Sequence, residues 1–178
     1  MKTLTKFSSI SLAIVFFAIT AFTAAPSSID TALPWAIDKA HSNITFEITH
    51  FFTPVNGKFH DYNADINFDP NDLEGSNVDV EVMVSSIDTD NEKRDGHLMS
   101  DDFFNAEKFP KITFASDKIT SEGDNKFLAH GKLTIKDVTR DVQLPFTLLG
   151  VNDHPMKENT TVAGIKIDYS IDRTDYDV

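Results

Sequence analysis

Residues 92–110, EKRDGHLMSDDFFNAEKFP, hold the side chains with the clearest potential for chemistry, because Arg94, Asp95 and His97 lie within four positions of one another. General acid–base catalysis needs a histidine that a carboxylate holds in place, with a nucleophile or a water molecule within hydrogen-bond reach. The segment favours a helix, on which Asp95 and His97, two positions apart, point in different directions. The chain also has no G-x-S-x-G nucleophile motif. We therefore expect a protein that is not an enzyme.

Arg94 has two other interpretations, and both stay open. In the first it is structural, and it pairs with a carboxylate or caps backbone carbonyls where the helical segment meets the rest of the fold. In the second it contacts a polar ligand headgroup, since a guanidinium binds phosphate through two hydrogen bonds. On a helix His97 falls on the same face as Arg94, so it is the second side chain that we consider for headgroup contact.

The histidines and acidic residues do not predict a metal site. None of the six histidines forms an H-x-x-x-H or H-E-x-x-H pair. A site built from His41, His50 and His60 across adjacent strands is an alternative, but ordinary strand positions explain these residues as well. The acidic stretch DPNDLEG (69–75) lacks the spacing of a calcium loop and is interpreted as a turn. We expect neither a metal nor a cofactor.

Composition narrows the class of protein. The 178 residues suffice for one domain, and their formal net charge of −12 opposes binding to nucleic acid or to anionic lipid headgroups. The absence of cysteine excludes disulfides, cysteine-ligated metals and cysteine nucleophiles. Fifteen phenylalanines in a chain of this size indicate an aromatic core or an apolar cavity.

The first 25 residues have the pattern of a signal peptide. Lys2 and Lys6 precede an apolar run at 7–22, and small residues follow at 23–28. A retained membrane anchor is the alternative, although the run is short for a bilayer span. We therefore expect a single domain at 26–178 that is periplasmic or secreted, with no stable membrane span after cleavage.

Most of the remaining chain alternates apolar and polar residues with a period of two, as half-buried strands do. Short turn sequences between these stretches indicate antiparallel up-and-down order, and closure into a barrel removes exposed sheet edges. A bulge near Asp61 would reconcile the two phases of the 57–69 stretch. We expect about eight strands and one short helical insertion near residues 92–105. The expected strands lie in the stretches 42–52, 57–69, 77–85, 111–119, 126–136, 141–150 and 161–171.

Several short motifs, in order from Trp35 to about Asp175, resemble those of the YceI-like family. They are WAIDKAHSNITF (35–46), GKF (57–59), FDP (68–70), RDGHLMSDDFF (94–104), FPKITFAS (109–116) and GKLTIKDVTRDV (131–142). The family consists of small secreted bacterial proteins whose lipocalin-like barrel binds polyisoprenoid lipids. Asp137 stands where the family usually has glycine. If the backbone there is left-handed, we expect the aspartate to lower stability slightly, with no change of fold. Family members also continue beyond the motif that resembles DRTDYDV through another strand, so a barrel without its closing strand stays open as an alternative.

The apolar face of the expected barrel is the predicted binding site. Residues alone leave two outcomes open, since eight strands enclose room either for packed side chains or for one ligand. The family resemblance favours a cavity. Phe103 and Phe104 are expected to act as an apolar stopper at one end. The other residues expected to line the cavity are Ile44, Phe46, Ile48, Val80, Val82, Phe109, Ile112, Phe114, Leu133, Ile135, Leu144 and Phe146.

The resemblance thus implies a protein that binds, carries or sequesters an amphiphilic polyisoprenoid, such as a quinone or a polyprenyl phosphate. Two alternatives remain: a hydrolase acting on a prenyl phosphate, and a stress-associated interaction protein with a packed interior. The expected partner is a small amphiphilic lipid, and association into a homodimer stays open.

Overall fold

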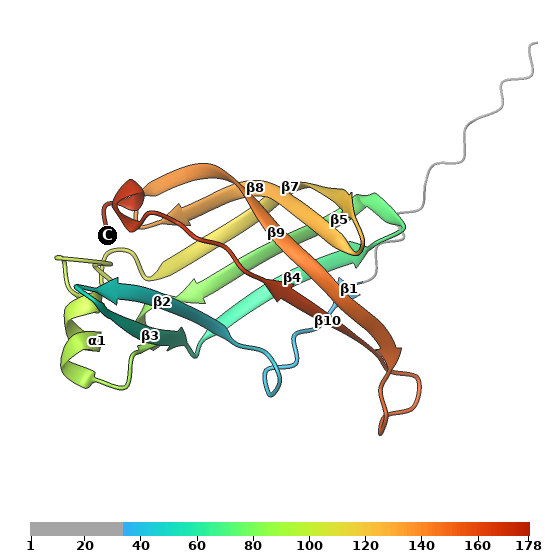
Figure 1. The fold of residues 1–178 in the computed structure, drawn as a ribbon, viewed down its shortest axis with the longest axis horizontal. Coiled ribbons are helices and arrows are strands. Elements are labelled where there is room, and N and C mark those ends of the chain that lie inside the picture. The colour runs from blue at the N-terminus through green and yellow to red at the C-terminus, as the bar shows by residue number, and fades with distance from the viewer. Residues whose placement is uncertain (1–33) are drawn as a thin grey trace, which may run out of the picture.

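The computed structural model describes residues 34–178 and is mainly antiparallel sheet (Figure 1). The predicted signal peptide, residues 1–25, lies outside the described residues. The strands are β1 (Pro34–Trp35), β2 (Ile44–His50), β3 (Thr53–Phe59), β4 (Tyr62–Asp69), β5 (Asp72–Met83), β6 (Ile87–Asp88), β7 (Lys111–Gly123), β8 (Lys126–Ile135), β9 (Val138–Asp153) and β10 (Thr161–Ile167). The helical elements are α1 (Glu92–Met99) and two 3₁₀ turns, η1 (Val84–Ser86) and η2 (Arg173–Tyr176).

Seven strands form one curled sheet, in the order β1-β4-β5-β7-β8-β9-β10, and β2, β3 and β6 form a second sheet. Every strand pair is antiparallel. Figure 1 shows the second sheet and α1 at the same end of the molecule as the C-terminus. Because β10 and β2 each end their own sheet, the described chain is a half-barrel and not a closed eight-stranded barrel. The all-β class and the lipocalin-like curl are confirmed.

Tight turns explain the consecutive pairing. Asp124 and Asn125 have positive φ angles of 49° and 59° between β7 and β8, as a two-residue hairpin turn requires. Between β8 and β9 the left-handed residue is Lys136, with φ of 56°, so Asp137 does not carry the strain that its place in the motif predicts. The turn predicted over 69–75 is shorter than expected, because β5 already begins at Asp72.

The predicted bulge near Asp61 is wrong. The chain instead leaves the small sheet after Phe59, turns at His60 and Asp61, and enters the large sheet at Tyr62. The two inward phases of this stretch therefore belong to different strands, and both Phe59 and Tyr62 are buried.

The predicted helical insertion is α1. Asn91 caps it, since its side-chain oxygen accepts a hydrogen bond from the backbone N–H of Arg94 at 3.0 Å. The chain then turns back on itself, with the backbone N–H of Phe104 donating to the carbonyl of Leu98 at 3.0 Å. Among residues 34–178 no helix has both the length and the apolar character that crossing a membrane requires.

Three clusters of side chains fill the interior. The largest lies inside the large sheet, where the rings of Phe68, Phe127 and Phe146 have centroids 5.1–5.3 Å apart. A second surrounds Phe59 and Tyr62 and includes Leu98 from α1. The third is formed by the last residues of the chain: Tyr176 and Val178 pack with Ile135, Phe103, Phe104, Ile112, Leu133 and Val138.

Candidate functional site

The residues predicted to line a cavity mostly contact one another. Val82, Phe114, Ile135 and Phe146 are 4–7% exposed and belong to the three clusters. Of the others, Ile48 is 42% exposed, and the remainder are half-buried: Ile44, Phe46, Val80, Phe103, Phe104, Phe109, Ile112, Leu133 and Leu144. The structure therefore divides this set among the packed clusters, except for Ile48 and Phe109, which belong to none of them. Contact of these residues with a ligand stays a prediction.

Arg94 is held by a buried hydroxyl. Thr89, 4% exposed, accepts a hydrogen bond from Arg94 Nε at 2.7 Å, and its carbonyl accepts one from Nη2 at 2.6 Å. The hydroxyl of Thr89 donates to Asp95 Oδ1 at 2.5 Å, and the same oxygen accepts the Thr89 backbone N–H at 3.0 Å. This network connects the start of α1 to the end of the small sheet, a structural role that was one of the two interpretations of Arg94.

His97 does not meet Asp95. Its Nε2 lies 3.1 Å from Asp102 Oδ2, and its ring stands edge-on to Phe103 with centroids 5.0 Å apart. Both partners of this ion pair are mostly exposed, at 60% and 72% of the side chain. Asp95 and His97 thus have separate partners, as the helical spacing predicted, and headgroup contact by His97 stays a prediction.

Phe103 and Phe104 lie at the end of the interior beside α1. Phe104 stands edge-on to Phe59, with centroids 6.5 Å apart. The guanidinium of Arg173 lies 5.8 Å from the centroid of the Phe103 ring. Burial raises the pKa of the neighbouring Tyr176 phenol, with Tyr169 contributing in the same direction. Aromatic side chains therefore gather at this end of the half-barrel, and the role of Phe103 and Phe104 as a stopper stays a prediction.

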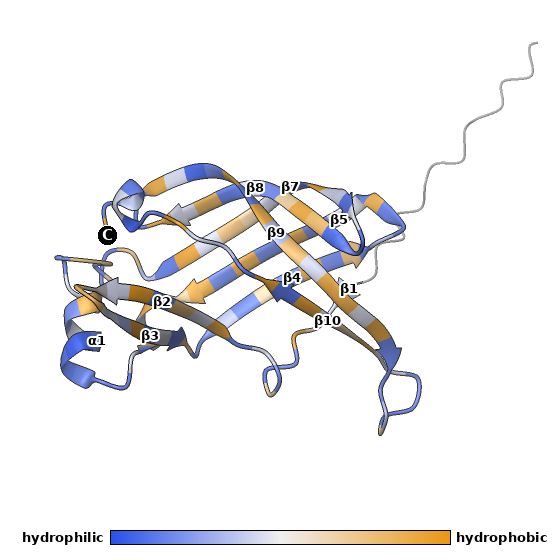
Figure 2. Cartoon of the chain, viewed as in Figure 1, coloured by the Kyte–Doolittle hydropathy of each residue, from blue (hydrophilic) through white to orange (hydrophobic). Residues whose placement is uncertain are grey.

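The inward face of β10 is the part of the interior that remains uncovered. Ile165 and Ile167 pair with Leu148 and Phe146, which are both 7% exposed, so all four share the inward face. Ile165 and Ile167 are nevertheless 40% and 55% exposed, and Tyr169 and Ile171 after the strand are 40% and 44% exposed. Figure 2 shows the alternation of apolar and polar residues along the neighbouring strands β8 and β9. Here a row of apolar side chains at the sheet edge is available to a ligand.

A hollow of about 700 Å³ borders the beginning of β10 and is called the seam hollow below. On one side lies the segment 34–40, which contributes Trp35, Ile37 and Lys39, and on the other lies the segment from His154 to Val162. Trp35 and Ile37 also pack against the core clusters, so the seam hollow borders the interior. Its lining combines apolar side chains with charged ones, Lys39 and Lys157 together with Asp38, and this combination suits an amphiphile.

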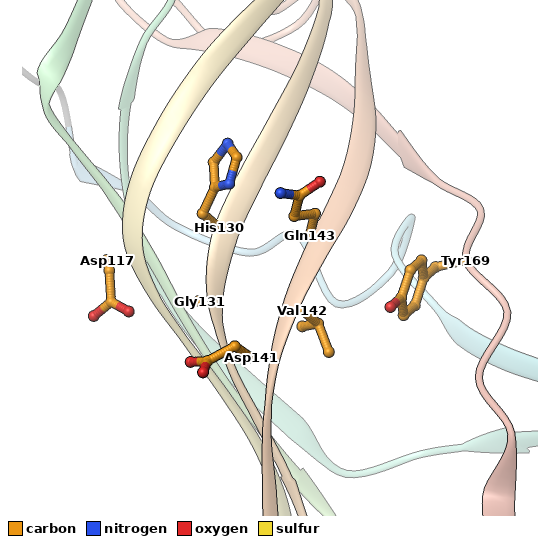
Figure 3. Close-up of a pocket in the computed structure, with 7 residues that line it drawn as sticks. All are labelled: Asp117, His130, Gly131, Asp141, Val142, Gln143 and Tyr169. Carbon is orange, nitrogen blue, oxygen red and sulfur yellow. The ribbon is translucent and has the colours of Figure 1, made fainter. Parts of the chain in front are cut away.

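A second hollow, of about 540 Å³, crosses β7, β8 and β9 (Figure 3). Its lining is mainly polar: Asp117, His130, Asp141 and Gln143, with Val142 and Tyr169 at one side. The Nε2 atom of His130 lies 2.8 Å from the hydroxyl of Thr120. This hollow does not suit an apolar tail, and the seam hollow is therefore the better candidate.

Two of the three histidines considered for a metal site have other partners, and the side chain of the third, His50, lies outside the described part of the structure. His41 Nδ1 lies 2.7 Å from Asp38, and His60 Nε2 lies 2.8 Å from Asp88. The hydrogen bond with His60, helped by the backbone N–H of Asp90 and by the charge of Lys58, lowers the pKa of Asp88 to about 2. Within residues 34–178 no three His, Asp or Glu side chains gather as metal ligands would.

The residues of the seam hollow were missed in the sequence-based site. Trp35 and Ile37 belong to a segment with only two residues of strand, too short for a period-two pattern to mark it. For β10 a signal existed, because Ala163, Ile165, Ile167, Tyr169 and Ile171 alternate with polar residues or glycine. Alternation shows which residues share a face, but not whether another element covers that face.

Comparison with known proteins gives consistent matches over the described chain. The model of the YceI-like domain matches residues 35–178. A UPF0312 protein of Staphylococcus aureus (strain N315) is 34% identical over 145 residues, which are 81% of this chain and 81% of the relative. A UPF0312 protein of Shewanella oneidensis is 34% identical over 164 residues, covering 85% of this chain and 83% of the relative.

Two solved structures share the fold. The crystal structure of BcnA from Burkholderia cenocepacia superposes with a TM-score of 0.71 at 26% identity, covering 80% of this chain and 84% of that chain. The YCEI protein of Campylobacter jejuni superposes with a TM-score of 0.64 at 35% identity, covering 80% and 82%.

Proposed function

The chain belongs to the YceI-like family, and we propose that it binds an amphiphilic polyisoprenoid, a quinone or a polyprenyl phosphate, which it carries or sequesters. The observation that carries this proposal is the uncovered inward face of β10 beside the seam hollow. A non-catalytic binding protein is what this family and this curled sheet support. Because residues 1–25 have the pattern of a signal peptide, we also propose that the protein is periplasmic or secreted.

The isoprenoid tail lies along Ile165 and Ile167 on the inward face of β10 and enters the seam hollow between Trp35 and Val162. Each apolar side chain that it covers is one that the fold leaves 40–55% exposed at β10. Covering apolar surface contributes roughly 25 cal/mol per Å². A long branched tail that covers the whole row therefore gains enough to bind without polar contacts along its length.

The headgroup lies at the rim of the seam hollow. Lys39, Lys157 and His154 belong to its lining in a protein whose formal net charge is −12. Lys39 Nζ is 4.0 Å from the centroid of the Tyr62 ring, a cation–π contact that helps to hold the ammonium group in place. A lysine binds a phosphate as a point charge and donates hydrogen bonds to a quinone carbonyl, so both headgroups fit this rim.

Native mass spectrometry of the gently purified chain tests the proposal, with uptake of an added isoprenoid quinone and of an added polyprenyl phosphate as a second measurement. We expect a bound lipid mass, or uptake of at least one probe. Ile165→Asp places a charge on the inward face of β10 and should reduce uptake at least tenfold. Leu149→Asp is the matched control, because Leu149 is 66% exposed and alternates with the inward Leu148.

The bare mass of a folded chain with no uptake of either probe would contradict the proposal. That result would support the interaction protein with a packed interior, for which the three side-chain clusters are the favourable observation. Turnover of a prenyl phosphate that is lost in His97→Ala would instead support the hydrolase.

A further inference from the structure

The hollow of about 540 Å³ across β7, β8 and β9, called the polar hollow below, has its polar lining on the outer face of the large sheet (Figure 3). Ala129 of β8 belongs to the buried core, so the next residue, His130, points to the opposite face. Gln143 pairs directly with His130 and therefore shares that outer face. Each of the three strands has a neighbour on both sides. The floor of the polar hollow thus lies within the sheet, on the face opposite the proposed lipid site.

A bulge in β7 shapes one wall of the polar hollow. Ser116 pairs with Gly131 and Lys118 pairs with His130, so Asp117 is the extra residue of the bulge. This extra residue places Asp117 in the lining of the polar hollow. Bulges are frequent beside functional sites, because they redirect a side chain from the regular pleat.

The lining offers both acceptors and donors of hydrogen bonds. Asp117 and Asp141 contribute carboxylate oxygens, and the amide of Gln143 contributes two N–H donors and one acceptor. These three residues are exposed, so a ligand can reach them from solvent. His130 is half-buried, and the contact of 2.8 Å between its Nε2 atom and the hydroxyl of Thr120 holds its imidazole in place. The lining therefore presents a fixed imidazole among accessible polar groups.

Lys132 is the counter-ion of the two carboxylates. Its Nζ atom lies 2.7 Å from Asp141 Oδ1. The hydrogen bond with Asp141, together with the charges of Asp141 and Asp117, raises the pKa of Lys132. A cationic ligand would compete with this ammonium group, and the same two carboxylates oppose an anion. The polar hollow therefore favours a ligand without net charge.

Tyr169 stands at one side of the polar hollow (Figure 3). Its ring is 40% exposed, so it offers an apolar surface that ends in a hydroxyl group. A sugar ring has the matching chemistry, since C–H groups cover its faces and hydroxyl groups, each both donor and acceptor, surround its rim.

We propose that the polar hollow binds a neutral saccharide of one or two sugar rings. The hydroxyl groups of the sugar bond to Asp117, Asp141 and Gln143, and a face of the ring packs against Tyr169. A volume of about 540 Å³ lies within the range of roughly 300–1,000 Å³ that is usual for small-molecule sites. The proposal does not rest on lipid binding, because the two sites lie on opposite faces of the sheet.

Titration of the ¹⁵N-labelled full chain, followed by the chemical shifts of its backbone amides, tests the proposal. The probes are glucose, N-acetylglucosamine and maltose, with spermidine and inorganic phosphate as charged probes. We expect at least one saccharide to give saturable shifts at Asp117, His130 and Gln143. Neither charged probe should saturate these amides.

Two variants test the assigned contacts. Asp117→Ala and Gln143→Ala each remove hydrogen-bonding groups at an exposed position, so both should fold like the wild type and bind the saccharide at least tenfold more weakly. Asp65→Ala is the matched control, because Asp65 is exposed on the outer face of β4 and does not line the polar hollow. Its affinity should equal that of the wild type.

The absence of saturable shifts with all three saccharides would overturn the proposal, as would unchanged affinity in both lining variants. Saturation by spermidine alone would overturn it too and would assign the polar hollow to an amine. Failure of the lipid proposal is distinguishable, because isoprenoid uptake is measured separately on Gln143→Ala and should equal that of the wild type.

Discussion

The cluster of Phe68, Phe127 and Phe146 and the apolar row of β10 show the same sequence pattern with opposite outcomes. In both regions apolar residues alternate along a strand and point to the inside of one curled sheet. The three phenylalanines are 2–7% exposed, whereas Ile165 and Ile167 are 40% and 55% exposed. The difference shows that alternation determines the face of a residue, while burial depends on what packs against that face.

The position in the sheet explains the two outcomes. Strand β8 has neighbours on both sides and faces Phe68 from β4 across the curl, so its inward residues find partners. Strand β10 has one neighbour and ends the sheet. The first region therefore contributes to stability, while the second keeps its apolar side chains partly exposed.

Truncation of one phenylalanine gives the largest expected difference between the two regions. Phe127→Ala removes a ring 4% exposed that contacts both Phe68 and Phe146, so the free energy of unfolding should fall by about 3–5 kcal/mol. Ile167→Ala should cost less than about 1 kcal/mol, since little apolar contact is lost. Urea denaturation measures the free energy of unfolding of both variants. Equal losses of stability would contradict the distinction between a packed core and an exposed row.

Replacing glycine by alanine compares the packing around the central strand β8 with that around the edge strand β10. A Cβ at Gly131 would lie 2.2 Å from the carbonyl oxygen of Ala115, which is backbone and cannot turn away. A Cβ at Gly164 would meet only the side chain of Leu149 at 3.4 Å. Gly131→Ala should therefore destabilise by about 1–3 kcal/mol, and Gly164→Ala by a few tenths. Thermal unfolding compares the two, and a tolerated Gly131→Ala would show that β7 is free to shift.

Threonine provides a polar version of the comparison. Thr89→Val keeps the shape of a 4% exposed side chain and removes the hydroxyl shared by Arg94 and Asp95, which should cost about 1–2 kcal/mol. Thr161→Val at the exposed start of β10 should stay within about 0.5 kcal/mol. If both denaturation midpoints are unchanged, the Thr89 network does not stabilise the attachment of α1.

The smallest expected effect is a change of stability at low pH. It concerns Asp88, which lies in β6 of the small sheet. The pKa of Asp88 is about 2 in the folded protein against an ordinary 3.8, chiefly because of the hydrogen bond with His60. Its contribution to stability is complete above the ordinary value and is lost as the pH falls from there to about 2. Asp88→Asn should flatten the pH dependence of the unfolding midpoint in this window by a small amount, since the pair is exposed to solvent. An unchanged profile would contradict the assignment.

Much of the fold was predictable from local pattern. The alternation around Val80, Phe114 and Leu133 lies in the central strands, where the period of two is unbroken. The helix was predictable because the residues from 92 onward leave the alternating pattern of the strands. The corner at His60 and Asp61 was not, because a bulge and a change of sheet produce the same shift of phase in a sequence.

For the candidate site, the sequence predicted which residues face the inside of the sheet, but not which of them remain uncovered. The inward set that includes Phe114 and Phe146 was chosen from alternation, and it contains residues that pack as core. Trp35 and Lys39 come together with Val162 through the curl of the sheet, across more than 100 positions of the chain. No local pattern contains that information.

The sequence by itself determined the class of this protein: a cysteine-free acidic chain of antiparallel strands with one helical insertion and the motifs of the YceI-like family. These features depend on neighbours in the chain, on turn residues and on a period of two. The tertiary structure decided which apolar residues are core and which line the open edge, and that Arg94 is tied to Thr89. Burial and hydrogen bonding depend on contacts between distant segments, and only the curl of the sheet brings those segments together.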